Sequence, residues 1–252
     1  MTETTGGSPQ SSGKKTEPSH SLLDTIMDSF VPIHADGQKF IAIGALATLV
    51  GFWLWQPLGW LLALVTIWIA YFFRDPPRVT PLRDGLVIAP ADGRICAIDK
   101  VRPPAEMGLG EAERVRISIF LNVFDVHINR APVSGTIKRS IYVPGAFVNA
   151  ALDKASEDNE RRSTIIATPA GDEIAVVQIA GWIARRIVTF VNEGQSIGMG
   201  QRIGLIRFGS RADVYLPPGK TALVSIGQRA VGGETVLADL KSDEPVREAR
   251  VV

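Results

Sequence analysis

The feature that most restricts how this chain can fold is an uncharged run of 34 residues, positions 40–73. As one straight helix the run would be about 51 Å long, well beyond the roughly 30 Å hydrocarbon core of a membrane. The residues Gln56-Pro57-Leu58-Gly59 interrupt it near the middle, where proline and glycine favour a break. We therefore expect two short apolar helices that form a hairpin, with both ends on the same side.

The residues around this run favour a hairpin that enters or just crosses a membrane. Trp53, Trp55 and Trp60 gather near the break, as is typical of side chains at a membrane interface. Basic residues flank the run: Lys39, Arg74, Arg78 and Arg83. Because cytoplasmic loops carry an excess of Lys and Arg, both ends are expected in the cytoplasm. The alternatives are a buried hairpin of a soluble protein and, less favoured, a secretory signal, since no small-residue cleavage site follows.

The overall composition excludes several classes of protein. The charge balance of 27 basic against 26 acidic side chains argues against a nucleic-acid binder. The single cysteine, Cys96, excludes an intramolecular disulfide and any Cys-rich metal site, and we expect no metal at all. We expect Cys96 to be a small buried side chain rather than a nucleophile.

Composition also divides the chain into four parts. Residues 1–20 contain no Leu, Ile, Val, Phe, Trp or Tyr and are expected to form a disordered tail. Residues 21–76 are expected to form a membrane-associated helical segment. Residues 77–242 consist of short β-rich stretches between Gly, Pro and Asp turns and should form the main domain. Residues 243–252 are expected to be a C-terminal tail.

One pattern occurs twice in the β-rich part. Gly194-Gln195 and Gly200-Gln201 return 33 positions later as Gly227-Gln228 and Gly233-Glu234. Spaced glycines before short apolar runs are typical of hairpin turns in a barrel-sandwich fold, similar to biotinyl and lipoyl carrier domains. The sequence thus predicts a mainly β, α+β fold, in which a helical hairpin precedes a β-rich domain with barrel-sandwich-like hairpins. No carrier function follows from the fold alone.

The pair Gly209-Ser210 lies between two β-rich runs, residues 202–208 and 213–216. Glycine permits a sharp bend there, and a bent, exposed carbonyl beside a hydroxyl is what an N-to-O acyl shift requires. The dipeptide alone is a weak signal, because Gly7-Ser8 repeats it in the tail. Its place between two strands supports the hypothesis that the chain cleaves itself before Ser210.

Six fragments, in order between residues 71 and 240, resemble the phosphatidylserine decarboxylases, in particular their short bacterial subclass. The fragments are Tyr71-Phe72-Phe73-Arg74-Asp75-Pro76, Pro90-Ala91-Asp92-Gly93, residues 120–132 with Asp125 and His127, Asn159-Glu160-Arg161-Arg162, Ala184-Arg185-Arg186-Ile187 and Phe208-Gly209-Ser210. The resemblance implies self-cleavage between Gly209 and Ser210 into a large chain (1–209) and a small chain (210–252) that stay associated. It also implies that Ser210 becomes a covalent pyruvoyl group, which forms a Schiff base with the substrate's serine amine and accepts the electrons released with carbon dioxide.

His127 is the histidine best placed for catalysis near neutral pH, because His20 lies in the tail and His34 precedes the uncharged run. Residues 124–129 alternate strictly, so on a strand Asp125, His127 and Asn129 would share one face. The alternative is a structural histidine. With the resemblance, we expect His127 to protonate the carbanion that decarboxylation leaves.

Asp92 matches the aspartate that the family pairs with histidine and serine, where a carboxylate fixes the imidazole tautomer. It could also simply shape an Asp-Gly turn. Longer family members have a second histidine for self-cleavage three residues after the first, but this chain has Arg130 there, and arginine is a poor base. Either His127 serves both steps, or Asp92 and Asp125 share the self-cleavage role.

The lipid phosphate requires cationic partners, and Arg130, Arg185 and Arg186 are candidates through bidentate hydrogen bonds. Adjacent arginines on a strand point to opposite faces, so at most one of Arg185 and Arg186 can face a given pocket. Either could instead rest on an anionic membrane surface.

The resemblance implies conversion of phosphatidylserine to phosphatidylethanolamine and carbon dioxide, in phospholipid biosynthesis, at the cytoplasmic face of the cell membrane. A decarboxylase of another serine-headed lipid, such as an ether-linked one, is an alternative within the same chemistry. A non-enzymatic, membrane-anchored β-domain adaptor is an alternative of another class. A serine hydrolase is disfavoured because Ser210 lacks the Gly-x-Ser-x-Gly motif. A homo-oligomer stays open.

Overall fold

The computed structural model describes residues 31–145, 159–181, 186–207, 210–242, 244, 245, 247, 249 and 250. The expected tail at 1–20, the first ten residues of the expected helical segment (21–30) and the residues Gly209 and Arg185 lie outside the described residues. The described residues from Pro32 onward belong to one compact unit.

The uncharged run forms a helical hairpin, as expected. Helix α2 (Ala35–Leu54) and helix α3 (Gln56–Phe72) are separated by Trp55, with Pro57 in the first turn of α3. Helix α2 begins earlier than the uncharged run and has 20 residues, so it is about 30 Å long, while the 17 residues of α3 give about 25 Å. The backbone N–H of His34 donates to the carbonyl of Phe73 at 2.8 Å, which ties the two ends of the hairpin together.

Small residues let the two helices pack closely. A Cβ atom on Gly44 would lie 2.7 Å from the Thr66 hydroxyl, and the Thr48 and Thr66 hydroxyls are 3.3 Å apart. Such packing is typical of helix pairs in membranes. The large apolar side chains point away from the pair: Leu46, Trp53 and Leu64 are 64%, 84% and 66% exposed. This exposure argues against the hairpin as the buried core of a soluble protein.

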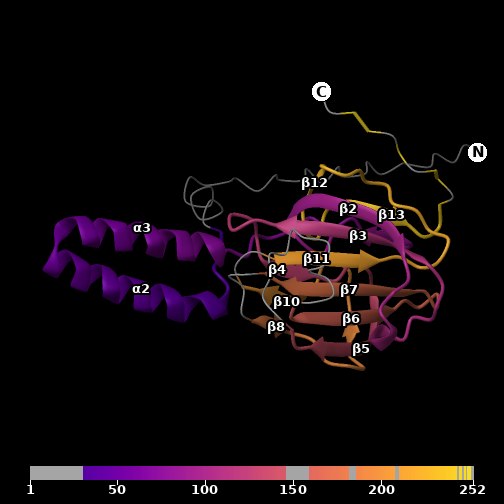
Figure 1. The fold of residues 1–252 in the computed structure, drawn as a ribbon, viewed down its shortest axis with the longest axis horizontal. Coiled ribbons are helices and arrows are strands. Elements are labelled where there is room, and N and C mark those ends of the chain that lie inside the picture. The colour runs from indigo at the N-terminus through magenta and orange to yellow at the C-terminus, as the bar shows by residue number, and fades with distance from the viewer. Residues whose placement is uncertain are drawn as a thin grey trace, which may run out of the picture. The chain divides into compact units, whose positions relative to one another are not determined.

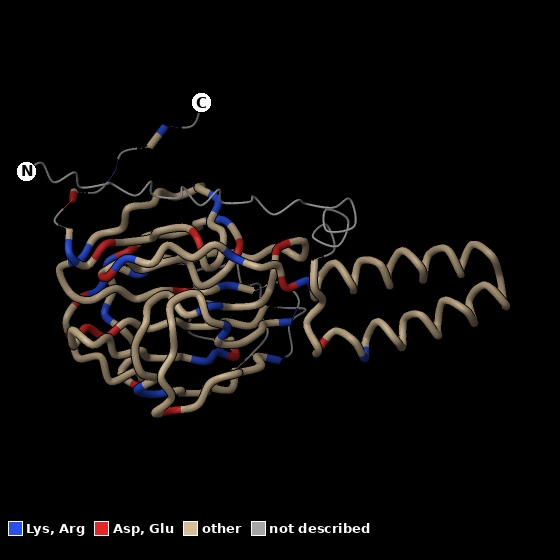
Figure 2. The backbone as a smooth tube through the Cα atoms, turned by 180° about the vertical axis from the view of Figure 1, so that it is seen from behind, with Lys and Arg blue, Asp and Glu red and all other residues tan. Residues whose placement is uncertain are grey.

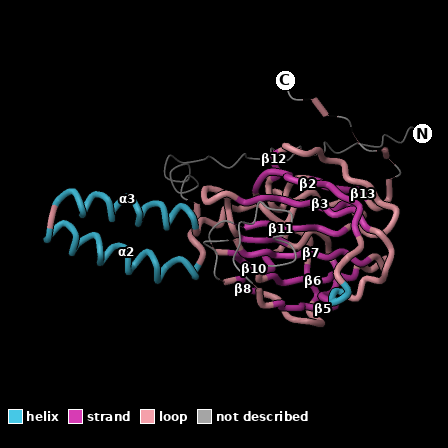
Figure 3. The backbone as a smooth tube through the Cα atoms, viewed as in Figure 1, coloured by secondary structure: helices cyan, strands magenta, loops and turns pink. Residues whose placement is uncertain are grey.

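The rest of the chain is mainly β, which confirms the expected fold class (Figures 1 and 3). The elements are β1 (Leu86–Ile88), β2 (Gly93–Val101), the 3-10 helix η1 (Ala105–Met107), β3 (Arg114–Leu121), β4 (Ile128–Arg130), β5 (Gly135–Val143), β6 (Arg161–Ala167), β7 (Glu173–Ala180), β8 (Ile187–Thr189), β9 (Ser196–Ile197), β10 (Arg202–Ile206), β11 (Ser210–Tyr215), β12 (Arg229–Ala230) and β13 (Val236–Asp239). In the described part of the chain they form an eight-stranded sheet β12-β2-β3-β11-β7-β6-β5-β9, a three-stranded sheet β4-β10-β8 and the pair β1-β13.

The two glycine patterns found in the sequence occupy equivalent places in the fold. The backbone of Gly194-Gln195 exchanges two hydrogen bonds with Ile137 of β5, and Gly227-Gln228 does the same with Ile95 of β2, all at 2.8–2.9 Å. In both strands a β-bulge follows the bonded isoleucine. Cys96 lies in the bulge of β2 and is exposed, so the expectation of a buried cysteine was wrong. The β-rich part therefore contains two similarly built halves, which the repeated glycine pattern reflects.

The sheets are layered so that the three-stranded sheet has two covered faces. Ile117, Val176 and Val214 belong to the main core and share one face of the eight-stranded sheet, which we call the inner face. Ile206 of β10 packs with Ala180 of β7. On the other side of β10, Leu205 packs with Phe72 and Phe73 at the base of the hairpin. The hairpin base is thus part of the folded β domain.

Candidate active site

Ser210 is the first residue of β11 and lies in the middle of the eight-stranded sheet. Leu121 of β3 is its partner on one side and Ala180 of β7 on the other. Because paired residues point to the same face of a sheet, the Ser210 side chain lies on the inner face. It is completely buried.

The surroundings of Ser210 suit a group that reacts rather than one that stabilises. Its Oγ has no hydrogen-bond partner among the described residues. A buried polar group left unpaired costs about 1–3 kcal/mol. The neighbours on the inner face, Ala180 and Ala212, are small, so the same position could hold a ketone formed from the serine side chain. The residues present therefore fit a pyruvoyl group at this position.

His127 reaches the same end of the sheet through β10. The backbone N–H of Ile206 donates to the carbonyl of His127 at 3.2 Å, and Ile206 packs against Ala180, the partner of Ser210. Ser210 is four positions after Ile206, so their Cα atoms are at most about 14 Å apart. On the other side of Ser210, Leu121 packs with Ala91, the residue before Asp92. The structure thus brings the regions of Ser210, His127 and Asp92 together.

The His127 ring is buried and held in one tautomer. Its Nδ1 lies 2.9 Å from the backbone carbonyl of Asp125, and a carbonyl can only accept, so Nδ1 carries the proton and Nε2 the lone pair. The ring of Phe72 lies against it, with centroids 4.2 Å apart. Burial lowers the pKa of His127 from 6.5 to about 4, and the carbonyl of Asp125 opposes this while the charge of Arg74 adds to it. His127 is therefore neutral at pH 7 and able to accept a proton.

The lowered pKa predicts a loss of stability in acid. Between pH 6.5 and 4 the unfolded chain protonates His127 while the folded chain does not, so the free energy of unfolding falls as the pH falls through this range. At pH 4 the loss from this residue should be about 3 kcal/mol. Chemical denaturation in detergent at pH 7.0 and 4.5 measures it, and a His127→Gln variant should lose clearly less stability than the wild type. Equal losses in the two proteins would contradict this.

Asp125 is placed differently from the strand prediction. Strand β4 begins only at Ile128, and Asp125 lies in the preceding turn, where its Oδ2 accepts from the backbone N–H of Asn122 at 2.9 Å. The strand prediction for residues 124–129 was therefore right only for Asn129 among the three polar residues, since His127 also precedes β4. Asp125 leaves the strand pattern because its carboxylate closes the turn. Its Oδ1 pairs with Arg229 at 2.5 Å. Asp125 contacts His127 through its backbone carbonyl.

Asp92 lies in a network of arginines. Both of its carboxylate oxygens accept from Arg78, at 2.9 and 2.8 Å, and Oδ1 also accepts from the backbone N–H of Gly232 at 2.8 Å. Arg74 connects this network to the histidine. The charge of Arg74 lowers the pKa of His127, and the charges of Asp92 and Asp125 act in turn on Arg74. Asp92 thus shapes a turn and interacts with Arg74, the arginine whose charge lowers the pKa of His127.

The three arginines proposed for phosphate binding have different surroundings. Arg130 is buried and donates to Asp75 and to the carbonyls of Pro76 and Gly200, at 3.0–3.1 Å. These hydrogen bonds give Arg130 a structural role: they join the residues that follow α3, Asp75 and Pro76, to β4. Arg186 is exposed, while Arg185 lies outside the described residues.

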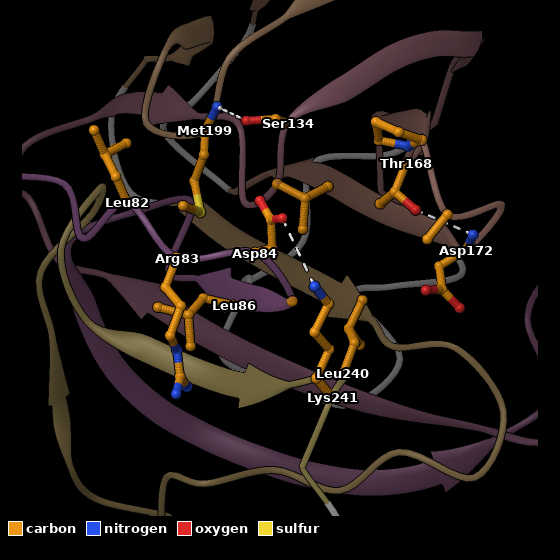
Figure 4. Close-up of a pocket in the computed structure, with 14 residues that line it drawn as sticks. Leu82, Arg83, Asp84, Leu86, Ser134, Thr168, Asp172, Met199, Leu240 and Lys241 are labelled. Atoms are coloured by element: carbon orange, nitrogen blue, oxygen red, sulfur yellow. Dashed lines mark hydrogen bonds and ion pairs between the residues drawn. The ribbon is translucent and has the colours of Figure 1, made fainter.

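A cavity of about 360 Å³ lies away from Ser210. The turn Thr168–Asp172 lines it, and this turn directly precedes Glu173, the first residue of β7. Ser210 lies opposite Ala180, the last residue of β7, and the two ends of this strand are about 23 Å apart. Figure 4 shows Ser134 accepting from the backbone N–H of Met199 at the cavity, as Asp92 accepts from that of Gly232 in the other half of the fold. Ser134, beside the cavity, therefore holds in one half of the fold the place that Asp92 holds in the other. We assign no catalysis to the cavity.

Sequence reasoning did not single out Arg78 and Arg229, the partners of Asp92 and Asp125. It named Arg74 and Arg78 only as charges beside a membrane segment. The fragment Arg74-Asp75-Pro76 was part of the resemblance and could have directed attention to them. No local pattern indicates Arg229, which is 104 positions from Asp125.

The chain is similar in sequence to known proteins. The family model described as phosphatidylserine decarboxylase matches residues 65–238. A curated relative, the phosphatidylserine decarboxylase proenzyme of Nitrobacter winogradskyi, is 60% identical over 213 residues, which cover 84% of this chain and 86% of the relative.

Proposed function

Since the chain belongs to the phosphatidylserine decarboxylase family, we propose that it is a self-cleaving, pyruvoyl-dependent enzyme that converts phosphatidylserine to phosphatidylethanolamine and carbon dioxide. The reaction is a carboxy-lyase step in phospholipid biosynthesis. The observation that carries the proposal is the Ser210 hydroxyl, which is fully buried and has no hydrogen-bond partner in the described part of the chain, at the end of the sheet where His127 lies.

Self-cleavage begins when Ser210 Oγ attacks the carbonyl carbon of Gly209 and the peptide bond is exchanged for an ester. His127 is the proposed base, because a neutral imidazole with its lone pair on Nε2 can take the hydroxyl proton. Elimination then breaks the Cβ–O bond, which releases the carboxyl end of the large chain and leaves dehydroalanine. Addition of water yields the pyruvoyl group and ammonia.

In turnover, the pyruvoyl group supplies a ketone beside an amide carbonyl, which serves as an electron sink. The chain's own residues orient the headgroup, exclude water and return a proton. We assign the proton transfer to His127, whose tautomer is fixed by the carbonyl of Asp125. Asp92 and Arg78 fix the neighbouring turn, and Arg74 sets the charge around the imidazole. Arg186, which is exposed, is the proposed phosphate ligand, with Arg185 as its neighbour.

The proposed substrate is a membrane lipid, and the helical hairpin is suited to anchor the protein in the same membrane. Among the described residues, α2 is the one helix long and apolar enough to cross a membrane. In Figure 2 the charged positions of the two helices lie only at the end next to the β-sheets. Lys39 and Arg74 are at this end, so the positive-inside tendency supports a site on the cytoplasmic side of the cell membrane.

Charges placed in the middle of the hairpin should release the protein from membranes. A Leu46→Lys/Leu64→Lys variant alters one exposed position in each helix. Each lysine costs about 2.5–3.5 kcal/mol at the bilayer centre, so most of the variant should move from the membrane pellet to the soluble fraction. Leu82→Lys, at an 88% exposed position of the β domain, is the matched control and should stay in the pellet. Equal pelleting of all three proteins would argue against insertion.

The function is tested with purified protein in mixed micelles of phosphatidylserine. We expect release of carbon dioxide with formation of phosphatidylethanolamine, and inhibition by hydroxylamine, which traps ketones. An ether-linked serine lipid assayed in parallel shows whether the linkage at the glycerol matters. A protein that stays uncut and releases no carbon dioxide would support the adaptor alternative instead.

A further inference from the structure

A pair of buried amides lies next to Ser210. The Nε2 of Gln178, on β7, lies 2.8 Å from the Oδ1 of Asn129, on β4, and the two side chains are 1% and 0% exposed. The bond joins the eight-stranded sheet to the three-stranded sheet. Gly204 makes room for it, because a Cβ atom there would lie 2.9 Å from Gln178 Nε2.

The pair is placed within reach of the reacting residue. Ala180 is the partner of Ser210, and Gln178 is two positions earlier on the same strand, so it shares the inner face. Such diagonal neighbours have Cα atoms about 7–8 Å apart, which a glutamine side chain can bridge. Asn129 is two positions after His127, and Gly204 and Ile206 of β10 oppose these two residues.

Each amide keeps one unused group. Asn129 Nδ2 and Gln178 Oε1 are buried without a hydrogen-bond partner among the described residues. Rotating both amides by 180° would reverse their bond and still leave one N–H donor and one carbonyl acceptor. Two unpaired buried groups cost stability, and an apolar pair of similar size would avoid that cost. A donor and an acceptor side by side match a ligand that has an acceptor and a donor on one carbon.

We infer that Asn129 and Gln178 form a subsite for the α-amino carboxylate of the lipid headgroup, with the amide N–H donating to the carboxylate and the amide carbonyl accepting from the amine. This inference rests on the proposed function. The amides are neutral, so they orient the carboxylate without the ion pair that would stabilise it against loss of carbon dioxide. Phosphatidylethanolamine lacks the carboxylate and should leave the subsite readily.

The test separates binding from turnover. Borohydride reduces the ketone of the mature enzyme, and the dissociation constants of short-chain phosphatidylserine and phosphatidylethanolamine are then measured by calorimetry. In an Asn129→Leu/Gln178→Met variant, self-cleavage and the melting temperature should be retained, and phosphatidylserine should bind about 10- to 100-fold more weakly. Binding of phosphatidylethanolamine should change much less.

Ser163→Ala is the matched control. The Ser163 hydroxyl is also buried without a hydrogen-bond partner among the described residues. Ser163 lies opposite Val177 in the sheet, however, so its side chain is on the other face from Gln178. This variant should bind both lipids like the wild type. If the double variant is not cut, the single Gln178→Met variant is titrated instead. Unchanged phosphatidylserine binding with a lower melting temperature would overturn the inference and make the pair a purely structural tie. A wild type that is neither cut nor active would instead refute the proposed function.

Discussion

Replacing Ser210 with alanine should leave one uncut chain of 252 residues. Without the Ser210 hydroxyl there is no nucleophile to attack the Gly209 carbonyl, and the electron-accepting ketone is never formed. Decarboxylase activity should therefore fall by at least about 10⁴-fold. The protein should still fold, because the hydroxyl has no hydrogen-bond partner among the described residues and its loss leaves nothing else unpaired.

Denaturing electrophoresis and carbon dioxide release check this prediction together. The control is Ser8→Ala, which changes the same Gly-Ser dipeptide in the N-terminal tail and should be cut and active like the wild type. Fragments of 209 and 43 residues from the Ser210→Ala variant would show that Ser210 is not the nucleophile.

Replacing His127 with glutamine should slow both steps. Glutamine can occupy the buried site beside Phe72, but it cannot exchange a proton. Loss of a general acid or base costs about 10²–10⁴-fold in rate, so self-cleavage should slow, and turnover by the fraction that is cut should fall by a similar factor. Timed cleavage after synthesis and turnover per cut chain measure the two effects separately.

The control for this variant is His34→Gln, which alters the residue that caps α2 and leaves the site intact. It should cut itself and turn over at wild-type rates. A His127→Gln protein that matures normally and keeps full turnover would exclude His127 from both roles. Normal maturation with lost turnover would instead assign self-cleavage to Asp92 or Asp125.

Elements with a local signal were predictable from the sequence. The hairpin follows from an uncharged run with Pro57 near its centre, and the structure has the break at Trp55, next to it. The repeated Gly-Gln pairs predicted turns of the β-rich domain, because glycine at positive φ is needed in each turn: Gly194 and Gly227 have φ of 80° and 89°.

The contacts of individual polar side chains were not predictable. Asp125 lies in a turn because its side chain accepts from the backbone N–H of Asn122, and the apolar alternation around it could not reveal this preference. The bond of Gln178 to Asn129 joins two sheets. The alternation of residues 124–129 marked Asn129 as polar on one face, but no sequence pattern marks Gln178 as its partner. Arg130 pairs with Asp75, 55 positions away, so its charge alone suggested a ligand role that its partners do not support.

The central claim is that a ketone derived from Ser210 holds the substrate during catalysis. The most direct test is to incubate purified wild-type protein with short-chain phosphatidylserine and borohydride and to measure the masses of the intact chains. We predict an unmodified chain of residues 1–209 and a chain of residues 210–252 that carries the lipid amine covalently at its first residue. A single unmodified chain of 252 residues that nevertheless releases carbon dioxide would contradict the account.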